Sequence, residues 1–60
     1  MNSIYNVSIF EVDFRGHNYK FIDDFFRQFN DYQDALKYAR WNCIETETFR
    51  RGYFISEVIL

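Results

Sequence analysis

The stretch DYQDALKYARWNC, residues 31–43, decides the fold because it predicts a helix between segments that suit strands. Asp31 is a good N-cap, and Asp34 places a carboxylate beside the free N–H groups of the first turn. Apolar residues then recur at helical spacing, at Tyr32, Ala35, Leu36, Ala39 and Cys43. We therefore predict a helix over residues 31–44 whose apolar stripe packs closely on a sheet.

Trp41 lies on the side of this helix that faces away from the apolar stripe, at about 100° per residue. Two interpretations stay open. The ring can fold back over the helix end and pack on the loop at 45–51. Alternatively, Tyr38, Arg40 and Trp41 form a partner-binding anchor, because these three residue types dominate binding hot spots. The second interpretation is our prediction.

Strands are predicted on both sides of the helix. Residues 4–14 are rich in Ile, Val, Phe and Tyr, and residues 15–18 have the composition of a hairpin turn. A second strand is predicted at 19–27, although Phe21, Phe25 and Phe29 also fit helical spacing. The last strand is predicted at 53–60, and a short fourth strand at 46–49 is an open alternative.

The resulting order is β-β-α-β in a single α+β domain over residues 1–60. A right-handed crossover through the helix lays the third strand beside the first. We therefore expect a three-stranded, mainly antiparallel sheet of order 2-1-3, covered on one face by one helix.

Large apolar residues occupy both faces of the last strand. One set is Tyr53, Ile55 and Ile59, and the other is Phe54, Val58 and Leu60. A bulge near Ile9 and Phe10 would restore the alternation of the first strand but not that of the last. One helix covers only one sheet face, so we expect a homodimer that buries the second face or pairs strand edges. The expected dimer interface is the first set.

The chain is short and has few residues for chemistry. Sixty residues bury only about 60% of the surface that the unfolded chain exposes. Cys43 is the only cysteine and His17 the only histidine, so neither an internal disulfide nor a zinc cluster is expected. We expect Cys43 to be a small buried apolar side chain and His17 a solvated turn residue, with no cofactor and no catalytic group.

The formal net charge of −2 gives no general attraction to nucleic acid or to anionic membranes. Neither a basic start followed by an apolar run nor a stretch long enough to span a bilayer is found, so we expect a cytoplasmic protein.

Residues 51–55, RGYFI, resemble the start of the aromatic strand of RNA-recognition domains. The match ends early, because Phe54 stands where that pattern has Gly or Ala and Ile55 where it has Phe. The resemblance leaves one alternative function open. Arg50, Arg51 and Tyr53 would bind single-stranded nucleic acid by charge and stacking.

The proline-free, aromatic-dense chain resembles the small accessory proteins of bacteriophages, many of which block a host enzyme or a defence system. This is a resemblance of character and transfers no residue roles. It implies a non-enzymatic module, expected to be a homodimer, that binds and blocks a partner protein. We expect an enzyme only if a shared dimer cleft brings carboxylates together.

Overall fold

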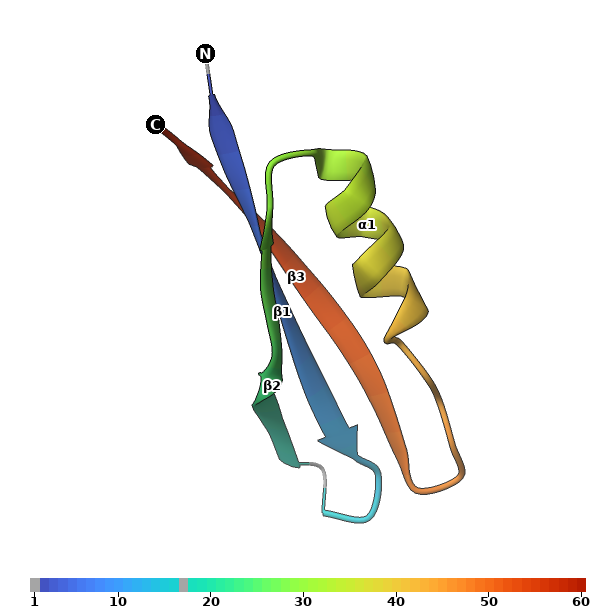
Figure 1. Ribbon diagram of the computed structural model, residues 1–60. Helices are drawn as coiled ribbons and strands as arrows, with labels where there is room; N and C mark the ends of the chain where they lie inside the picture. The colour runs from blue at the N-terminus through green and yellow to red at the C-terminus, as the bar shows by residue number, and fades with distance from the viewer. Residues whose placement is uncertain (1, 17) are drawn as a thin grey trace.

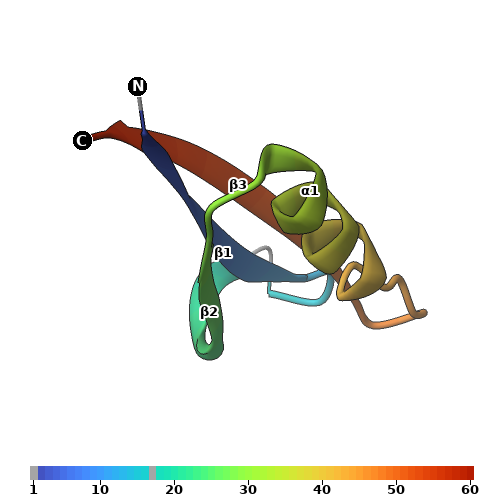
Figure 2. The same ribbon diagram turned by 45° about the horizontal axis from the view of Figure 1, so that its top comes forward.

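The computed structural model describes residues 2–16 and 18–60, so the prediction for His17 lies outside the described residues. The order of elements is β-β-α-β, as predicted: β1 at Ser3–Asp13, β2 at Asn18–Phe29, α1 at Tyr32–Trp41 and β3 at Phe49–Ile59 (Figure 1). Both β2 and β3 pair antiparallel with β1, which gives the expected sheet order β2-β1-β3. Helix α1 lies on one side of this sheet (Figure 2).

The start of α1 confirms the predicted cap. Asp31 has extended backbone angles, and its side chain accepts a 2.7 Å hydrogen bond from the N–H of Gln33. The helix ends at Trp41 rather than at residue 44. Asn42 is the C-cap, and its side-chain amide donates a 2.8 Å bond to the carbonyl of Tyr38.

The fully buried core consists of Val7 and Ile9 on β1 and Ala35 and Ala39 on α1. The two alanines allow the helix to lie close to the sheet, as the sequence predicts. Larger residues pack around this core: Tyr5, Phe25, Phe29, Tyr38 and Ile55. Because β1 side chains alternate, Val7 and Ile9 define the helix side of the sheet. No helix or strand of the described residues covers the other face, which we call the uncovered face.

Strand β2 contains a large register shift. Val7 pairs with Arg27 and Ile9 pairs with Ile22, so residues 23–26 all lie opposite Ser8. The guanidinium of Arg27 donates to the carbonyls of Asp24 and Phe26, at 3.2 and 2.7 Å, and so satisfies backbone groups freed from the ladder. The bulge considered for the first strand near Ile9 and Phe10 is therefore absent from β1, which pairs with β3 without interruption, and the extra residues belong to β2.

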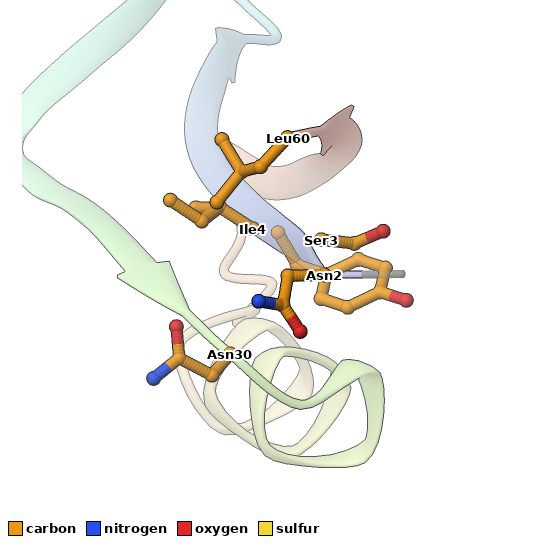
Figure 3. Close-up of a pocket in the computed structure, with 6 residues that line it drawn as sticks. Asn2, Ser3, Ile4, Asn30 and Leu60 are labelled. Carbon is orange, nitrogen blue, oxygen red and sulfur yellow. The ribbon is translucent and has the colours of Figure 1, made fainter.

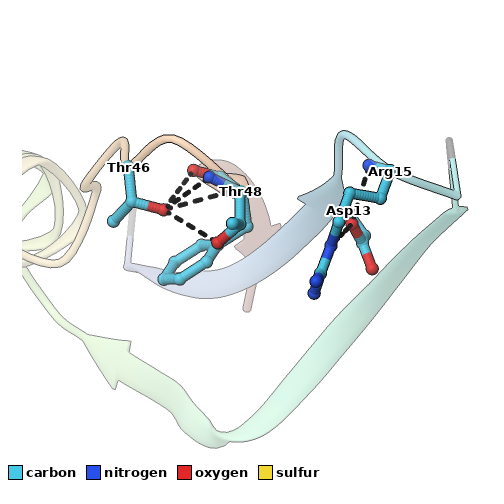
Figure 4. A network of polar contacts seen from close by, with 5 residues as sticks. Asp13, Arg15, Thr46 and Thr48 are labelled. Carbon is cyan, nitrogen blue, oxygen red and sulfur yellow. Dashed lines mark hydrogen bonds and ion pairs between the residues drawn. The ribbon is translucent and has the colours of Figure 1, made fainter.

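Residues 46–48 form a turn, and β3 begins at Phe49 rather than at residue 53. The hydroxyl of Thr46 accepts bonds from the N–H groups of Thr48 and Phe49, at 3.2 and 3.1 Å (Figure 4). The N–H of Phe14 donates to the carbonyl of Thr48 at 3.0 Å and ties this turn to the end of β1. The alternative of a fourth strand at 46–49 is therefore wrong for this stretch.

The turn after β1 is held by its own carboxylate. The carboxylate of Asp13 accepts a 2.9 Å hydrogen bond from the backbone N–H of Arg15 (Figure 4). The Nε of the Arg15 guanidinium lies 3.7 Å from the same carboxylate oxygen. The backbone bond and then the nearby cation lower the pKa of Asp13.

Candidate functional site

Four aromatic side chains meet on the uncovered side of the sheet. Val7 and Ile9 on β1 are buried under the helix. Phe10 follows Ile9 in the same uninterrupted strand, so its side chain points to the opposite face, away from the helix. The ring centroids are 6.2 Å apart for Phe10 and Phe21, 5.5 Å for Phe10 and Phe54, and 6.1 Å for Phe21 and Phe54. Tyr19 continues the group, 6.4 Å from Phe21. We call Phe10, Tyr19, Phe21 and Phe54 the aromatic face.

The outer rings of the aromatic face are open to solvent. The exposed fractions are 69% for Tyr19, 52% for Phe21 and 58% for Phe54. Single exposed apolar residues are common on protein surfaces, but a contiguous apolar patch marks an interaction site. These rings come from all three strands, so the sheet itself fixes their spacing.

Gly52 fixes the position of the central ring. It pairs with Phe10 across β1 and β3, and the Phe10 ring lies directly over it. A Cβ added at Gly52 would overlap Cζ of Phe10 and lie 2.8 Å from Cε1. The absence of a Cβ at residue 52 therefore leaves the space that the Phe10 ring occupies while it contacts Phe21 and Phe54.

A hollow of about 320 Å³ opens beside the aromatic face. Phe21 belongs to both, and Ser8, Asp23 and Phe26 are among the other residues that line the hollow. The β2 register shift creates it, because residues 23–26 leave the ladder opposite Ser8. Such a hollow can receive an apolar side chain from a docked protein.

The aromatic face has little charge around it. Among the described residues of β1 and β3 that share its orientation, Arg50 is the one charged side chain. The guanidinium of Arg50 lies 3.9 Å from the carboxylate of Glu45. On β2, Asp23 adds a carboxylate in the hollow beside the aromatic face. With one carboxylate and one paired arginine, the described part of this surface is better suited to contact an apolar protein surface than a chain of phosphates.

The three residues of the anchor predicted on the helix do not lie on one surface. Trp41 is 87% exposed, so the alternative in which the ring packs back on the 45–51 loop is wrong. Arg40 is also exposed. Tyr38, however, packs against Phe29 with centroids 5.4 Å apart and donates its hydroxyl to the carbonyl of Phe25 at 2.8 Å. Tyr38 therefore belongs to the packing around the core, and Trp41 and Arg40 remain at the surface.

The residues predicted for the dimer interface lie on the helix side of the sheet. Ile55 pairs with buried Val7 and packs against the core, and Tyr53 and Ile59 share its orientation. The uncovered face therefore presents the opposite set of β3 residues, including Phe54 and Val58. The role of Tyr53, Ile55 and Ile59 in a dimer interface stays a prediction.

The residues of the nucleic-acid alternative do not share one surface. Arg51 makes a 3.2 Å ion pair with Glu11 on the helix side. Its guanidinium also lies over the rings of Phe25 and Phe49, at 5.1 and 5.4 Å from their centroids. Tyr53 is on this same side, whereas Arg50 is on the other.

A second hollow, of about 490 Å³, lies where the two ends of the chain run side by side. In Figure 3, Ile4 and Leu60 lie on one side of it and Asn30 lies across from them, with Asn2 and Ser3 nearby. Its lining is mostly polar and includes no Asp, Glu, His, Lys or Arg side chain. We therefore place the candidate site at the aromatic face.

Few groups in the described chain are placed for chemistry. Cys43 is half-buried and unbridged, and burial raises the pKa of its thiol. Among residues 2–16 and 18–60, no three His, Cys, Asp or Glu side chains come together in a way that could hold a metal ion. None of the described helices has the length and apolar character needed to cross a membrane.

Comparisons of the chain with protein-family models, with curated proteins and with solved structures find no significant match.

Sequence reasoning did not identify the aromatic face as a site. Phe10 and Phe21 were assigned only to strands, and Phe54 only to an apolar set. The available signal was the failure of strand alternation together with the 23% aromatic content.

Proposed function

We propose that this chain is a non-enzymatic protein-binding module that docks on a partner protein through the aromatic face. The observation that carries the proposal is the contact of four rings from three strands on the sheet side that α1 leaves open. Rings of this kind supply large contact areas with little loss of conformational freedom. The adjoining hollow offers a place for one apolar anchor of the partner.

A protein partner fits this surface better than single-stranded nucleic acid does. Stacking on bases works together with cations that follow the phosphate backbone. Here Arg50 is close to Glu45, and Arg51 is held by Glu11 and two rings on the opposite side. The formal charge of −2 also opposes the approach of a polyanion.

The mode of action that we propose is occlusion. A small rigid sheet that covers an apolar surface of its partner prevents other molecules from reaching it. This matches the phage accessory proteins that the chain resembles, so the proposed target is a host enzyme or a defence protein.

The test compares two surfaces of one molecule. Immobilised wild-type protein, Phe54→Ser and Trp41→Ala are exposed to a lysate of the source cells, and captured proteins are quantified by mass spectrometry. Phe54 and Trp41 are both exposed, and they lie on the aromatic face and on the helix, respectively. We expect one partner to be retained by the wild type and by Trp41→Ala, and to fall at least about tenfold with Phe54→Ser, as hot-spot truncations do.

The opposite pattern would support the helix anchor predicted from sequence and contradict docking through the sheet. Binding to single-stranded oligonucleotides at low salt is measured in parallel. Tight binding that weakens with salt and with Arg50→Gln would favour the nucleic-acid alternative.

A further inference from the structure

The outer edge of β3 is available for strand pairing. β3 lies at one edge of the sheet. The N–H of Leu60 donates to the carbonyl of Asn2 at 2.9 Å, and the N–H of Phe14 donates to that of Thr48 at 3.0 Å. Antiparallel hydrogen bonding alternates along a strand. These two bonds therefore show that the even-numbered residues of β3 direct their backbone N–H and C=O groups toward β1. The odd-numbered residues direct their N–H and C=O groups outward.

The first outward groups are already used by the same chain. The N–H of Arg51 donates to the carbonyl of Ile44, and the N–H of Thr46 donates to the carbonyl of Phe49, both at 2.8 Å. Beyond this segment, the outward residues are Tyr53, Ile55, Glu57 and Ile59. Within the described residues, no bond from their outward groups to another segment is found. The free run therefore extends from residue 53 to the end of β3 at Ile59.

Apolar side chains flank this free edge on both sides. Tyr53 and Ile59 are exposed on the helix side, and Phe54 and Val58 are exposed on the uncovered side. Ile59 is 62% exposed even though it lies in a strand. A long apolar edge of this kind is a template for pairing with another strand.

We propose that the β3 edge pairs antiparallel with β3 of a second copy of this chain, symmetrically about Ser56. Ser56 is the midpoint of the free run 53–59, so this register uses every free outward group. It places Tyr53 opposite Ile59 of the second copy and Phe54 opposite Val58. Two-fold symmetry makes each apolar pair occur twice, with Tyr53 of either copy opposite Ile59 of the other and Phe54 opposite Val58 in the same way.

The charge distribution agrees with a second copy as the occupant. Glu57 is the one charged residue in the run 53–59. In this register it lies opposite Ile55 of the second copy, so like charges do not face each other directly. Glu57 is also engaged within its own chain, where it accepts a 2.7 Å bond from the Ser3 hydroxyl.

This pairing does not rest on the proposed function, because it uses the edge of the sheet. Of the four residues of the aromatic face, Phe54 alone lies in the paired run. Sedimentation equilibrium of the wild type over a micromolar concentration range should give the mass of two 7.4 kDa chains. Ile59→Lys should raise the dimer dissociation constant at least about tenfold, the scale of a hot-spot loss. Trp41→Lys is the matched control on an exposed apolar site and should leave the constant unchanged. Circular dichroism verifies that each variant is folded.

A single-chain mass at every concentration would overturn the proposal. A dimer that survives Ile59→Lys but is lost with Phe21→Ser would also overturn it, because that result places the contact on the aromatic face.

A designed disulfide tests the register directly. In the proposed pairing, Ser56 faces its own copy in a non-hydrogen-bonded pair, with Cα atoms about 4.5 Å apart, which a disulfide can span at about 4.4–6.8 Å. Ser56→Cys in a Cys43→Ser background should form a covalent dimer with oxidised glutathione. Gln28→Cys on β2, in the same background, should remain monomeric on a non-reducing gel. Equal cross-linking of the two variants, or none with Ser56→Cys, would refute the Ser56 register.

Discussion

Replacement of Gly52 by alanine should destabilise the protein because it displaces the Phe10 ring. The added Cβ overlaps Phe10 Cζ and lies 2.8 Å from Cε1, so the ring must leave its place against the sheet. Phe10 then loses its contacts with Phe21 and Phe54. Each aromatic pair stabilises the fold by about 0.5–1.5 kcal/mol. Replacing a strand glycine by alanine by itself stabilises the fold by about 0.5–1 kcal/mol. The expected net loss is about 1 kcal/mol of unfolding free energy, or roughly 4–8 °C in Tm.

Gly52→Ala should raise the free energy of unfolding, instead of lowering it, when the Phe10 ring is absent. In a Phe10→Val background no aromatic ring covers residue 52, so Gly52→Ala keeps only its backbone benefit of about 0.5–1 kcal/mol. The four proteins of this double-mutant cycle are compared by urea unfolding, followed by circular dichroism at one fixed chain concentration, because association shifts apparent stability. Stabilisation by Gly52→Ala in both backgrounds would show that the ring does not rest on the glycine, and the account of the aromatic face would fail.

Three further outcomes are expected. Asp31→Ala should cost about 1 kcal/mol by loss of the helix cap, with Asp31→Ser as the control that keeps an acceptor, measured as a shift in the urea midpoint. Trp41→Ala should change stability by less than about 0.5 kcal/mol because the ring is 87% exposed, and a loss of several kcal/mol would contradict its placement. Because burial raises the pKa of Cys43, its thiol stays protonated to higher pH, and alkylation by iodoacetamide should begin at higher pH in the folded protein than in urea. Equal pH profiles in the two states would contradict this.

The helix and the element order could be predicted because their signals are local. Asp31 caps the first turn, and Ala35 and Ala39 mark the buried side, all within nine residues of chain. The strand order followed from the handedness of one crossover. These features need no knowledge of how distant residues pair.

The candidate site could not be predicted because it depends on register. β3 has apolar residues at both parities, so its sequence does not show whether Ile55 or Phe54 faces the helix. The register shift in β2 is equally hidden, because Phe25 and Phe26 suit either face of a strand. Only the paired strands bring Phe10, Phe21 and Phe54 together from three distant segments.

Tyr38 shows the same limit on the helix. Its angle around the helix axis lies between the buried alanines and the surface, and packing decides where it belongs. Phe29 and the carbonyl of Phe25 supply a stacking partner and an acceptor, and both come from β2. The sequence of the helix alone contains neither.

The register shift in β2 determines how far sheet growth can proceed. A dimer joined through β3 has a β2 strand at each outer edge. At that edge, residues 23–26, which include two adjacent aspartates, leave the hydrogen-bonded ladder. The Arg27 guanidinium donates hydrogen bonds to the carbonyls of Asp24 and Phe26, so these carbonyls are already engaged. An incoming strand cannot continue a regular ladder past this segment, and interrupted, charged edges are the means by which natural sheets avoid fibril growth. If β3 pairs as proposed, each chain therefore has one edge that pairs with a strand and one edge that does not, and the assembly should stop at two chains instead of growing into a fibre.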